Sequence, residues 1–214
     1  MIPGDTYTIG SPESPTHTRH TVTVTDFAIQ RTEVTVGEFI QFLNQRPPDP
    51  AYTSEQIYFH QGRCHARVDS QLPVAYVSYA DAVAYADWRS DRGRDLYRLP
   101  TATEWEIAAS AGQPGRPFPW GWAPAKGRAQ FDAEGPKTVG DFAPNPLGLY
   151  DMAGNVAEWT QAKNEDDDTA PVMGGSWAER DPDLLRVFHR LQFPRAYRDA
   201  DVGFRLVRTG IHGP

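Results

Sequence analysis

The sequence has a single cysteine, Cys64, among its 214 residues. One thiol cannot form an intrachain disulfide, so the chain lacks the cross-linked framework that holds many small extracellular domains together. This scarcity fits a reducing compartment, and we expect the protein to be cytoplasmic. The abrupt start at Met1-Ile2-Pro3-Gly4 would also fit a domain that has been cut from a longer protein.

Long apolar runs and an excess of basic residues are also missing. No stretch approaches the roughly 20 apolar residues of a membrane-spanning helix, and the N-terminus lacks the charged-then-apolar pattern of a secretion signal. The 28 acidic residues outnumber the 21 lysines and arginines, which gives a net charge of −7. Nucleic acids and anionic membranes select basic surfaces, so we expect neither a nucleic-acid partner nor a membrane span.

What the sequence has in quantity is glycine, proline and tryptophan, with 18, 19 and 6 residues. Gly and Pro at this density predict many turns and few long elements. At three of the places where a carboxylate follows a hydroxyl residue by three positions, the spacing at which both side chains cap a helix, a run that suits a short helix follows. We therefore expect short helices that begin at Thr35, Ser78 and Thr101, with strands at 6–9, 21–24 and 202–207.

The stretch with the densest unusual composition runs from residue 145 to residue 177. It reads NPLGLYDMAGNVAEWT and, after an acidic loop, GGSW. The stretch is too irregular for a long helix or strand, and it carries two carboxylates, Asp151 and Glu158, among glycines and tryptophans. The sequence therefore predicts either a functional site or a tightly folded structural element here.

Several short motifs occur in a fixed order along the chain. They read Glu33-Val34-Thr35, Arg98-Leu99-Pro100-Thr101, Phe118-Pro119-Trp120-Gly121, Gly148-Leu149-Tyr150-Asp151-Met152, Gly154-Asn155-Val156-x-Glu158-Trp159, Gly174-Gly175-Ser176-Trp177 and Gly203-Phe204-Arg205. In order and spacing this set resembles the formylglycine-generating-enzyme (sulfatase-modifying-factor) domain family. The resemblance implies a single domain over residues 1–210 and a tail at 211–214. It also implies an α+β, C-type-lectin-like fold of the formylglycine-generating-enzyme type, irregular, with short antiparallel strands and a few short helices.

The resemblance does not settle activity, because the family's scaffold carries several functions. Its members include copper-dependent oxidases that convert a cysteine to formylglycine, iron-dependent sulfoxide synthases, oxidases of siderophore maturation, non-catalytic paralogues and retroelement-diversified variable proteins. The copper enzymes use two thiolates, the soft ligands that Cu(I) prefers, after the Gly-Gly-Ser-aromatic motif. By that spacing the matching positions here are Glu179 and Leu184, and Cys64 is too distant in sequence to supply a pair. We therefore expect no copper and no catalysis.

A structural cation site of the family matches residues of the central stretch. The resemblance assigns its ligands to the side chains of Asp151 and Glu158 and to the backbone carbonyls of Gly154 and Val156. Such hard oxygen donors suit Ca²⁺, and a glycine lets the backbone fold tightly around an ion. The alternative is that the two carboxylates only cap turns of an irregular loop. We expect a structural Ca²⁺ at these four residues.

The segment 178–201, between the Gly-Gly-Ser-Trp and Gly-Phe-Arg motifs, has the composition of a recognition surface. Aromatic rings supply rigid contact area, and arginines supply forked hydrogen bonds. The segment resembles the variable region of retroelement-diversified proteins, which display changeable side chains on a fixed scaffold. The predicted ligand-binding residues are Trp177, Glu179, Phe188, His189, Leu191, Gln192, Phe193, Tyr197, Asp199 and Asp201. The alternative is that Phe188, Leu191 and Phe193 belong to the core.

These patterns favour a non-catalytic module that binds a protein or small-molecule ligand through its C-terminal surface, on a calcium-stabilised C-type-lectin-like scaffold. A variable protein diversified by a retroelement is one form of this hypothesis. The alternative is a divergent metal-dependent oxidase of the formylglycine-generating-enzyme family, which acts on a small molecule or peptide without the copper-binding cysteine pair. His189 and Glu179 would be its acid–base pair, but nothing in their spacing orients one on the other.

Overall fold

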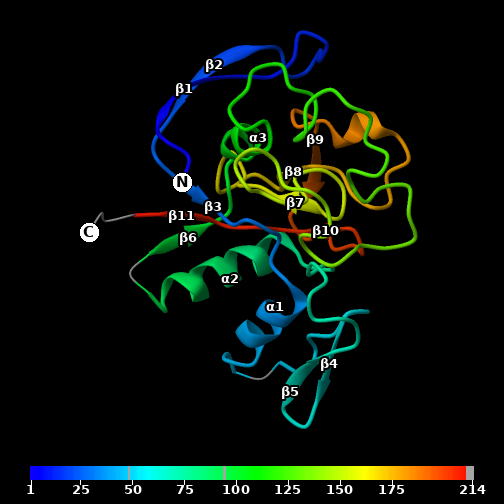
Figure 1. Ribbon diagram of the computed structural model, residues 1–214. Coiled ribbons are helices and arrows are strands. Elements are labelled where there is room, and N and C mark those ends of the chain that lie inside the picture. Colours follow the sequence, from blue (N-terminus) through cyan, green and yellow to red (C-terminus); the bar gives the residue numbers. More distant parts are fainter. Residues whose placement is uncertain (48, 94, 211–214) are drawn as a thin grey trace.

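The computed structural model describes residues 1–47, 49–93 and 95–210, and the tail expected at 211–214 lies outside them. Short strands and helices alternate with irregular segments (Figure 1). The strands are β1 (Asp5–Ile9), β2 (His20–Val24), β3 (Ala28–Ile29), β4 (Ile57–His60), β5 (Arg63–Ala66), β6 (Leu96–Arg98), β7 (Ala157–Trp159), β8 (Thr169–Met173), β9 (Arg190–Pro194), β10 (Val202–Gly203) and β11 (Val207–Thr209). The helices are α1 (Val36–Leu43), α2 (Tyr79–Ser90) and α3 (Ala102–Ala109), with a 3₁₀ turn, η1, at Pro182–Leu185. This mixture confirms the expected α+β architecture.

Each α-helix begins where the sequence predicts it. Thr35, Ser78 and Thr101 are the N-caps, and each forms a capping box with the residue three positions later. In α1 the Thr35 hydroxyl accepts a hydrogen bond from the Glu38 N–H at 3.2 Å, and the Glu38 carboxylate accepts one from the Thr35 N–H at 2.9 Å. Such caps stabilise helices that are too short to form alone. None of the helices in the described ranges is long and apolar enough to cross a membrane.

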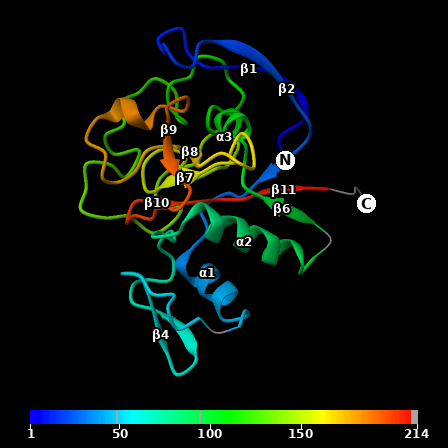
Figure 2. The same ribbon diagram turned by 180° about the vertical axis from the view of Figure 1, so that it is seen from behind.

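Within the described residues, the strands form two sheets and two separate hairpins. The central sheet has the order β10-β7-β8-β9, and a second sheet has the order β3-β11-β6. Strand β10 is parallel to β7, whereas β8 is antiparallel to both β7 and β9. The β1–β2 hairpin lies at one end of the molecule and the β4–β5 hairpin at the other (Figure 1). Helices α1 and α2 lie between the sheets and the β4–β5 hairpin, as the view from behind also shows (Figure 2).

The C-terminal run at 202–207 is two strands rather than the single strand expected. Strand β10 ends at Gly203 in the central sheet, and β11 begins at Val207 in the second sheet. Phe204, Arg205 and Leu206 carry the chain from one sheet to the other, and all three are 0% exposed. The break between the strands therefore brings an arginine side chain into the interior.

Apolar residues pack around this C-terminal run. One cluster joins α1 and α2 to the central sheet and includes Phe39, Tyr85, Trp159 and Phe204. The rings of Phe39 and Tyr85 stack with their centroids 5.8 Å apart, and Phe204 meets both of them edge-on. A second cluster packs around α3, where Trp105 is fully buried. The buried arginine therefore lies where the two sheets and their helices meet.

Candidate functional site

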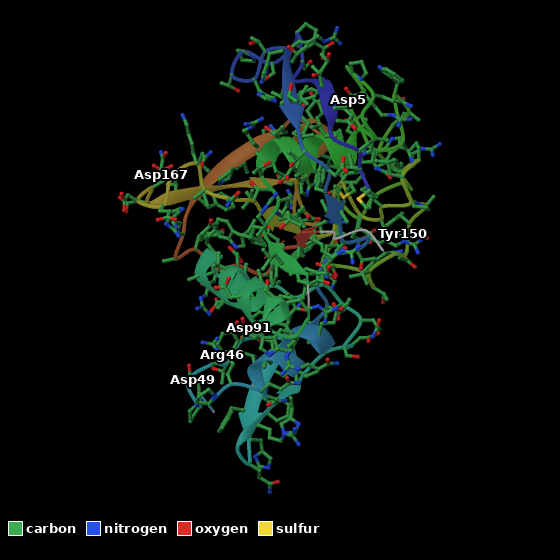
Figure 3. All side chains as sticks on the ribbon, turned by 90° about the vertical axis from the view of Figure 1, so that its left-hand side faces the viewer. Asp5, Arg46, Asp49, Asp91, Tyr150 and Asp167 are labelled. Carbon is green, nitrogen blue, oxygen red and sulfur yellow. The ribbon has the colours of Figure 1, made fainter. Side chains whose placement is uncertain are left out.

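The buried side chain of Arg205 joins the C-terminal run to the 145–159 stretch. Its guanidinium donates to both carboxylate oxygens of Glu158, with N–O distances of 2.7, 2.8 and 3.0 Å. Trp105 donates its indole N–H to Glu158 Oε2 at 2.7 Å. Arg205 also donates to the carbonyl of Tyr150 at 2.9 Å. Tyr150 lies on the side of the molecule opposite the loop tip at Asp167 (Figure 3). The ion pair of Arg205 and Glu158 therefore ties the 145–159 stretch to the C-terminal run by charge-assisted hydrogen bonds.

Two further carboxylates lie beside this ion pair. Glu33, just before α1, accepts a hydrogen bond from Asn155 Nδ2 on its Oε1 at 2.8 Å. Its Oε2 is buried without a hydrogen-bond partner in the described part of the chain, and the guanidinium of Arg205 is 3.9 Å away. Asp151 has a left-handed backbone, with φ 54°, and accepts the N–H of Gly140 at 2.6 Å. Glu158 and Glu33 thus share one guanidinium, at 2.7 and 3.9 Å, and the charge of Asp151 acts on Arg205 from nearby.

Burial, together with the surplus of negative charge, shifts the pKa values of these groups. Burial raises the pKa of Glu33 well above its ordinary value, and the charge of Asp151 raises it further. Burial also raises the pKa of Asp151, and the hydrogen bond from Gly140 offsets only part of that effect. Burial lowers the pKa of Arg205, but the combined attraction of Glu158, Glu33 and Asp151 outweighs it, so the pKa is raised. A buried cluster of this kind favours an added proton or an added cation.

Two of the four residues predicted as calcium ligands, Asp151 and Glu158, belong to this cluster, and Gly154 and Val156 lie between them in the sequence. The carbonyl oxygens of Gly154 and Val156 accept no hydrogen bond within residues 1–47, 49–93 and 95–210. Gly154 has φ 72°, and a Cβ there would collide with the carbonyl oxygen of Gln130, so the turn requires glycine. In the same ranges no three His, Cys, Asp or Glu side chains form a ready metal site. The Asp151 carboxylate and the two free carbonyls are nevertheless oxygen donors of the kind that suits Ca²⁺, whereas both oxygens of Glu158 already accept hydrogen bonds from Arg205 and Trp105.

The predicted recognition residues divide between opposite edges of the central sheet. Residues 191–193 lie on β9 at one edge. Asp201 directly precedes β10 at the other edge, where its carboxylate accepts the hydroxyl of Ser176 at 2.7 Å. Trp177 is also at that edge, because its indole N–H donates to the carbonyl of Ala200 at 3.3 Å. The segment 178–201 therefore crosses the sheet instead of forming one continuous patch.

The β10 edge has an acidic and aromatic character. Burial raises the pKa of Glu179, and the nearby charge of Asp201 raises it further. Asp199 is exposed and accepts a hydrogen bond from the hydroxyl of Tyr197 at 2.8 Å. This bond raises the pKa of Tyr197 to about 12. Together with Trp177, these carboxylates form a polar rim next to β10.

Phe188 is a correction to the predicted surface. Its side chain is only 9% exposed and belongs to the apolar cluster that contains Trp105. The preceding Val187 donates its N–H to the carbonyl of Pro117 at 2.9 Å, which fixes this stretch against a distant loop. Composition could not reveal that contact, and Phe188 is a core residue.

The other aromatic residues of the segment occupy intermediate positions. Phe193 and Tyr197 are half-buried, with ring centroids 4.5 Å apart, and Phe193 meets Trp159 edge-on at 6.4 Å. Leu191 and Gln192 are exposed. Phe193 therefore contributes to packing, whereas Leu191 and Gln192 are free to contact a ligand.

The positions that match the copper ligands of the family hold no sulfur. Leu184 lies in η1, and Glu179 precedes that turn. Cys64 is buried in β5, in the hairpin at the far end of the molecule, where its N–H donates to Asn44 Oδ1 at 2.8 Å. His189 is half-buried, burial lowers its pKa, and its Nε2 has no hydrogen-bond partner within the described ranges. The geometry therefore pairs no base with Glu179.

Strand β9 is an open edge strand of the central sheet, a feature that no pattern in the sequence indicated. In β8, Pro171 directs its carbonyl toward β7, where it accepts the N–H of Thr160 at 2.9 Å. Gln192 lies opposite Pro171, so the alternation of antiparallel pairs directs the N–H and C=O of Gln192 away from β8. The backbone N–H and C=O of Arg190, which lies opposite Met173, also point away from β8. No other strand in the described part of the chain pairs with this edge, so these backbone groups face outward.

A groove of about 1090 Å³ adjoins β9 and extends to α2 and β6. Tyr79, Ala162 and Pro171 contribute apolar surface to it, and charged residues of both signs, such as Arg195 and Asp87, also line it. A volume of this size can hold a small molecule or several residues of a peptide. Segments far apart in the sequence form the groove, so no local pattern could have predicted it.

This irregular α+β fold, in which a buried arginine of the Gly-Phe-Arg motif joins the glutamate of the Gly-Asn-Val-x-Glu-Trp motif, is that of a formylglycine-generating-enzyme-type domain. Residues 1–210 match the family described as the sulfatase-modifying factor enzyme 1-like domain, and the chain belongs to this family. It is 31% identical, over 98% of its length, to the serine/threonine-protein kinase pkn1 of Chlamydia pneumoniae. It is 38% identical, over 51% of its length, to the inactive C-alpha-formylglycine-generating enzyme 2 of Bos taurus. These alignments span 37% and 40% of the two relatives.

Solved structures share the whole fold. PvdO from Pseudomonas aeruginosa superimposes with a TM-score of 0.80 at 28% identity, covering 97% of this chain and 92% of that one. Treponema denticola variable protein 1 superimposes with a TM-score of 0.77 at 24% identity, covering 96% and 92%. These likenesses confirm the irregular, C-type-lectin-like fold class that the sequence motifs imply.

Proposed function

We propose that this chain is a non-catalytic ligand-binding module that displays a recognition surface from its C-terminal segment. The observation that carries the proposal is the pair of residues at the positions of the copper-binding thiolates, Glu179 and Leu184. Neither side chain supplies the soft sulfur ligand that copper oxidation needs, and Cys64 lies in a distant hairpin. The bovine relative, named as an inactive formylglycine-generating enzyme, supports the same conclusion. A retroelement-diversified variable protein is one form of such a module.

The open edge of β9 favours a polypeptide ligand in an extended conformation. An added strand could pair with the outward N–H and C=O groups of Arg190 and Gln192, which supplies affinity without sequence preference. Alternate side chains of that strand would enter the groove beside β9 or contact the exposed Leu191. The backbone therefore provides binding energy, and the side chains of segment 178–201 provide selectivity.

Replacing Gln192 by proline is expected to abolish the binding of peptides selected on the wild-type protein from a random peptide library. Proline removes the outward N–H, and an edge position that faces solvent tolerates it, so the fold should persist. Gln192→Ala keeps the N–H and is the matched control, which should retain binding. Fluorescence anisotropy measures the affinity, and the melting temperature checks the fold. Equal affinity of Gln192→Pro and wild type would contradict strand pairing, and failure to select any peptide would contradict a polypeptide ligand.

We further propose that the scaffold binds one Ca²⁺ through the side chains of Asp151 and Glu158 and the carbonyls of Gly154 and Val156. The free carbonyls and the surplus of buried carboxylates support this assignment. The ion would supply positive charge that offsets the repulsion among the carboxylates. An ion that binds only the folded state stabilises it in proportion to the logarithm of its concentration. Its role here would be structural.

A further inference from the structure

The β4–β5 hairpin carries a basic and aromatic face in a protein that is acidic overall. Residues 57–67 contain two arginines and two histidines but no aspartate or glutamate, whereas the whole chain has a net charge of −7. The hairpin forms one end of the molecule, beyond α1 (Figure 1). It is remote in sequence from β9 and from segment 178–201, so ligand binding at those places does not account for this concentration of positive charge.

Alternation along the two strands separates a core face from an outer face. The core face holds the four residues that belong to, or pack against, the apolar cluster of α1 and α2, namely Ile57, Phe59, Cys64 and Ala66. The outer face therefore carries Tyr58 opposite His65 and His60 opposite Arg63. Arg67 follows β5 and extends this outer face, because its guanidinium lies over the ring of Tyr58 at 5.0 Å.

The hairpin is fixed relative to the rest of the protein. Asn44, the C-cap of α1, donates from Nδ2 to the carbonyl of Cys64 at 3.0 Å and accepts the Cys64 N–H on Oδ1 at 2.8 Å. The loop between the strands is Gln61-Gly62, and both residues have a positive φ, 48° and 81°, as a type I′ turn requires. The outer face is therefore presented in one orientation, which lowers the entropy cost of binding a partner.

The side chains of the outer face form a row that is open to solvent. The rings of Tyr58 and His65 stack with their centroids 5.3 Å apart, and the centroid of His60 is 6.5 Å from that of His65. Both histidines and both arginines of the face are exposed. Among the residues that the structure describes, Arg63 and Arg67 have no ion-pair partner, so both guanidinium groups are available to another molecule.

We propose that the outer face of the β4–β5 hairpin binds an acidic segment of a polypeptide partner. Arginine presents a planar fork of N–H donors that matches the two oxygens of a carboxylate, and two such forks lie on this face. The face is about 13 Å long, the length of a four-residue strand, so it covers a few residues of an extended chain. The complementary charge of Asp and Glu side chains therefore selects the partner.

Two observations favour an acidic polypeptide over a nucleic acid. A nucleic acid carries its charge along its whole length, and beyond this small face it would meet a protein of net charge −7. The ring of Tyr58 is also already contacted by His65 and by Arg67, which reduces the surface on which a base could stack. A short acidic segment needs neither a long basic track nor a free ring.

The test is the binding of a fluorescently labelled peptide of six alternating Asp and Glu residues at low ionic strength, measured by anisotropy. We expect the double variant Arg63→Gln/Arg67→Gln to bind this peptide about tenfold more weakly than wild type, a loss of about threefold for each exposed ion pair. Binding to wild type should weaken as salt is added, because salt screens exposed charges. Both side chains are exposed, so the melting temperature of the variant should equal that of wild type.

The matched control is Arg92→Gln/Arg128→Gln, which removes two exposed arginines outside the hairpin and so gives the same net charge. This control should bind the acidic peptide as wild type does. Equal binding by the hairpin variant and wild type would overturn the role of this face, and so would an acidic peptide that binds wild type no better than hexaglutamine. Tighter binding of a single-stranded RNA oligonucleotide, lost in the hairpin variant, would overturn the choice of a polypeptide partner.

Discussion

Replacing Arg205 by methionine is expected to lower the free energy of unfolding by about 3–5 kcal/mol, the usual effect of removing one partner of a buried ion pair. The substitution leaves Glu158, which is 0% exposed, without its bidentate partner at 2.7 Å, next to Glu33 and Asp151. Methionine fills similar space, so the loss reports on charge more than on volume. Urea denaturation of both proteins in chelator measures the difference.

The control for this prediction is Arg208→Met. Arg208 pairs with Asp95 at 3.1 Å, but the two side chains are 39% and 32% exposed. Pairs in contact with solvent contribute about 0–1 kcal/mol, so this variant should unfold close to wild type. Similar losses for the two methionine variants would contradict a special role for the interior pair.

Replacing Gly154 by alanine is expected to cost about 2–4 kcal/mol, the sum of a left-handed backbone penalty and local overpacking. Gly154 has φ 72°, and an added Cβ would collide with the carbonyl of Gln130. Gly148→Ala is the matched control, because Gly148 has φ 74° but no atom within 4 Å of an added Cβ. The control should show the backbone penalty alone, about 1–2 kcal/mol, in the same denaturation assay. Equal losses for the two alanine variants would show that the loop around residue 154 is not tightly packed.

The parts of the fold that sequence analysis predicted well are those fixed by neighbouring residues. The starts of α1, α2 and α3 depend on a hydroxyl and a carboxylate three residues apart, so Thr35, Ser78 and Thr101 could be identified as N-caps. The run at 202–207 was predicted wrongly as one strand. Its alternating pattern cannot show that β10 pairs with β7 while β11 pairs with β3 and β6.

The candidate site was harder to predict, because distant residues form it. Asp151 and Glu158 could be named from a motif, but Glu33 is 125 positions before Glu158, and only the fold brings it to Arg205. The segment 178–201 was expected to form one surface. Whether its side chains are exposed depends on β9 and β10 lying at opposite edges of the sheet, which no local pattern specifies. For that reason composition assigned Phe188 to the surface, although it lies in the core.

The central claim is that this member of the family is a calcium-stabilised binding module and not a copper or iron oxidase. The most direct test is the metal content of the chain purified without added ions, measured by inductively coupled plasma mass spectrometry. The account predicts about one calcium per chain, held by the oxygen donors around Asp151, and no stoichiometric transition metal, because the thiolate positions hold Glu179 and Leu184. Copper or iron bound at a stoichiometric level would contradict it.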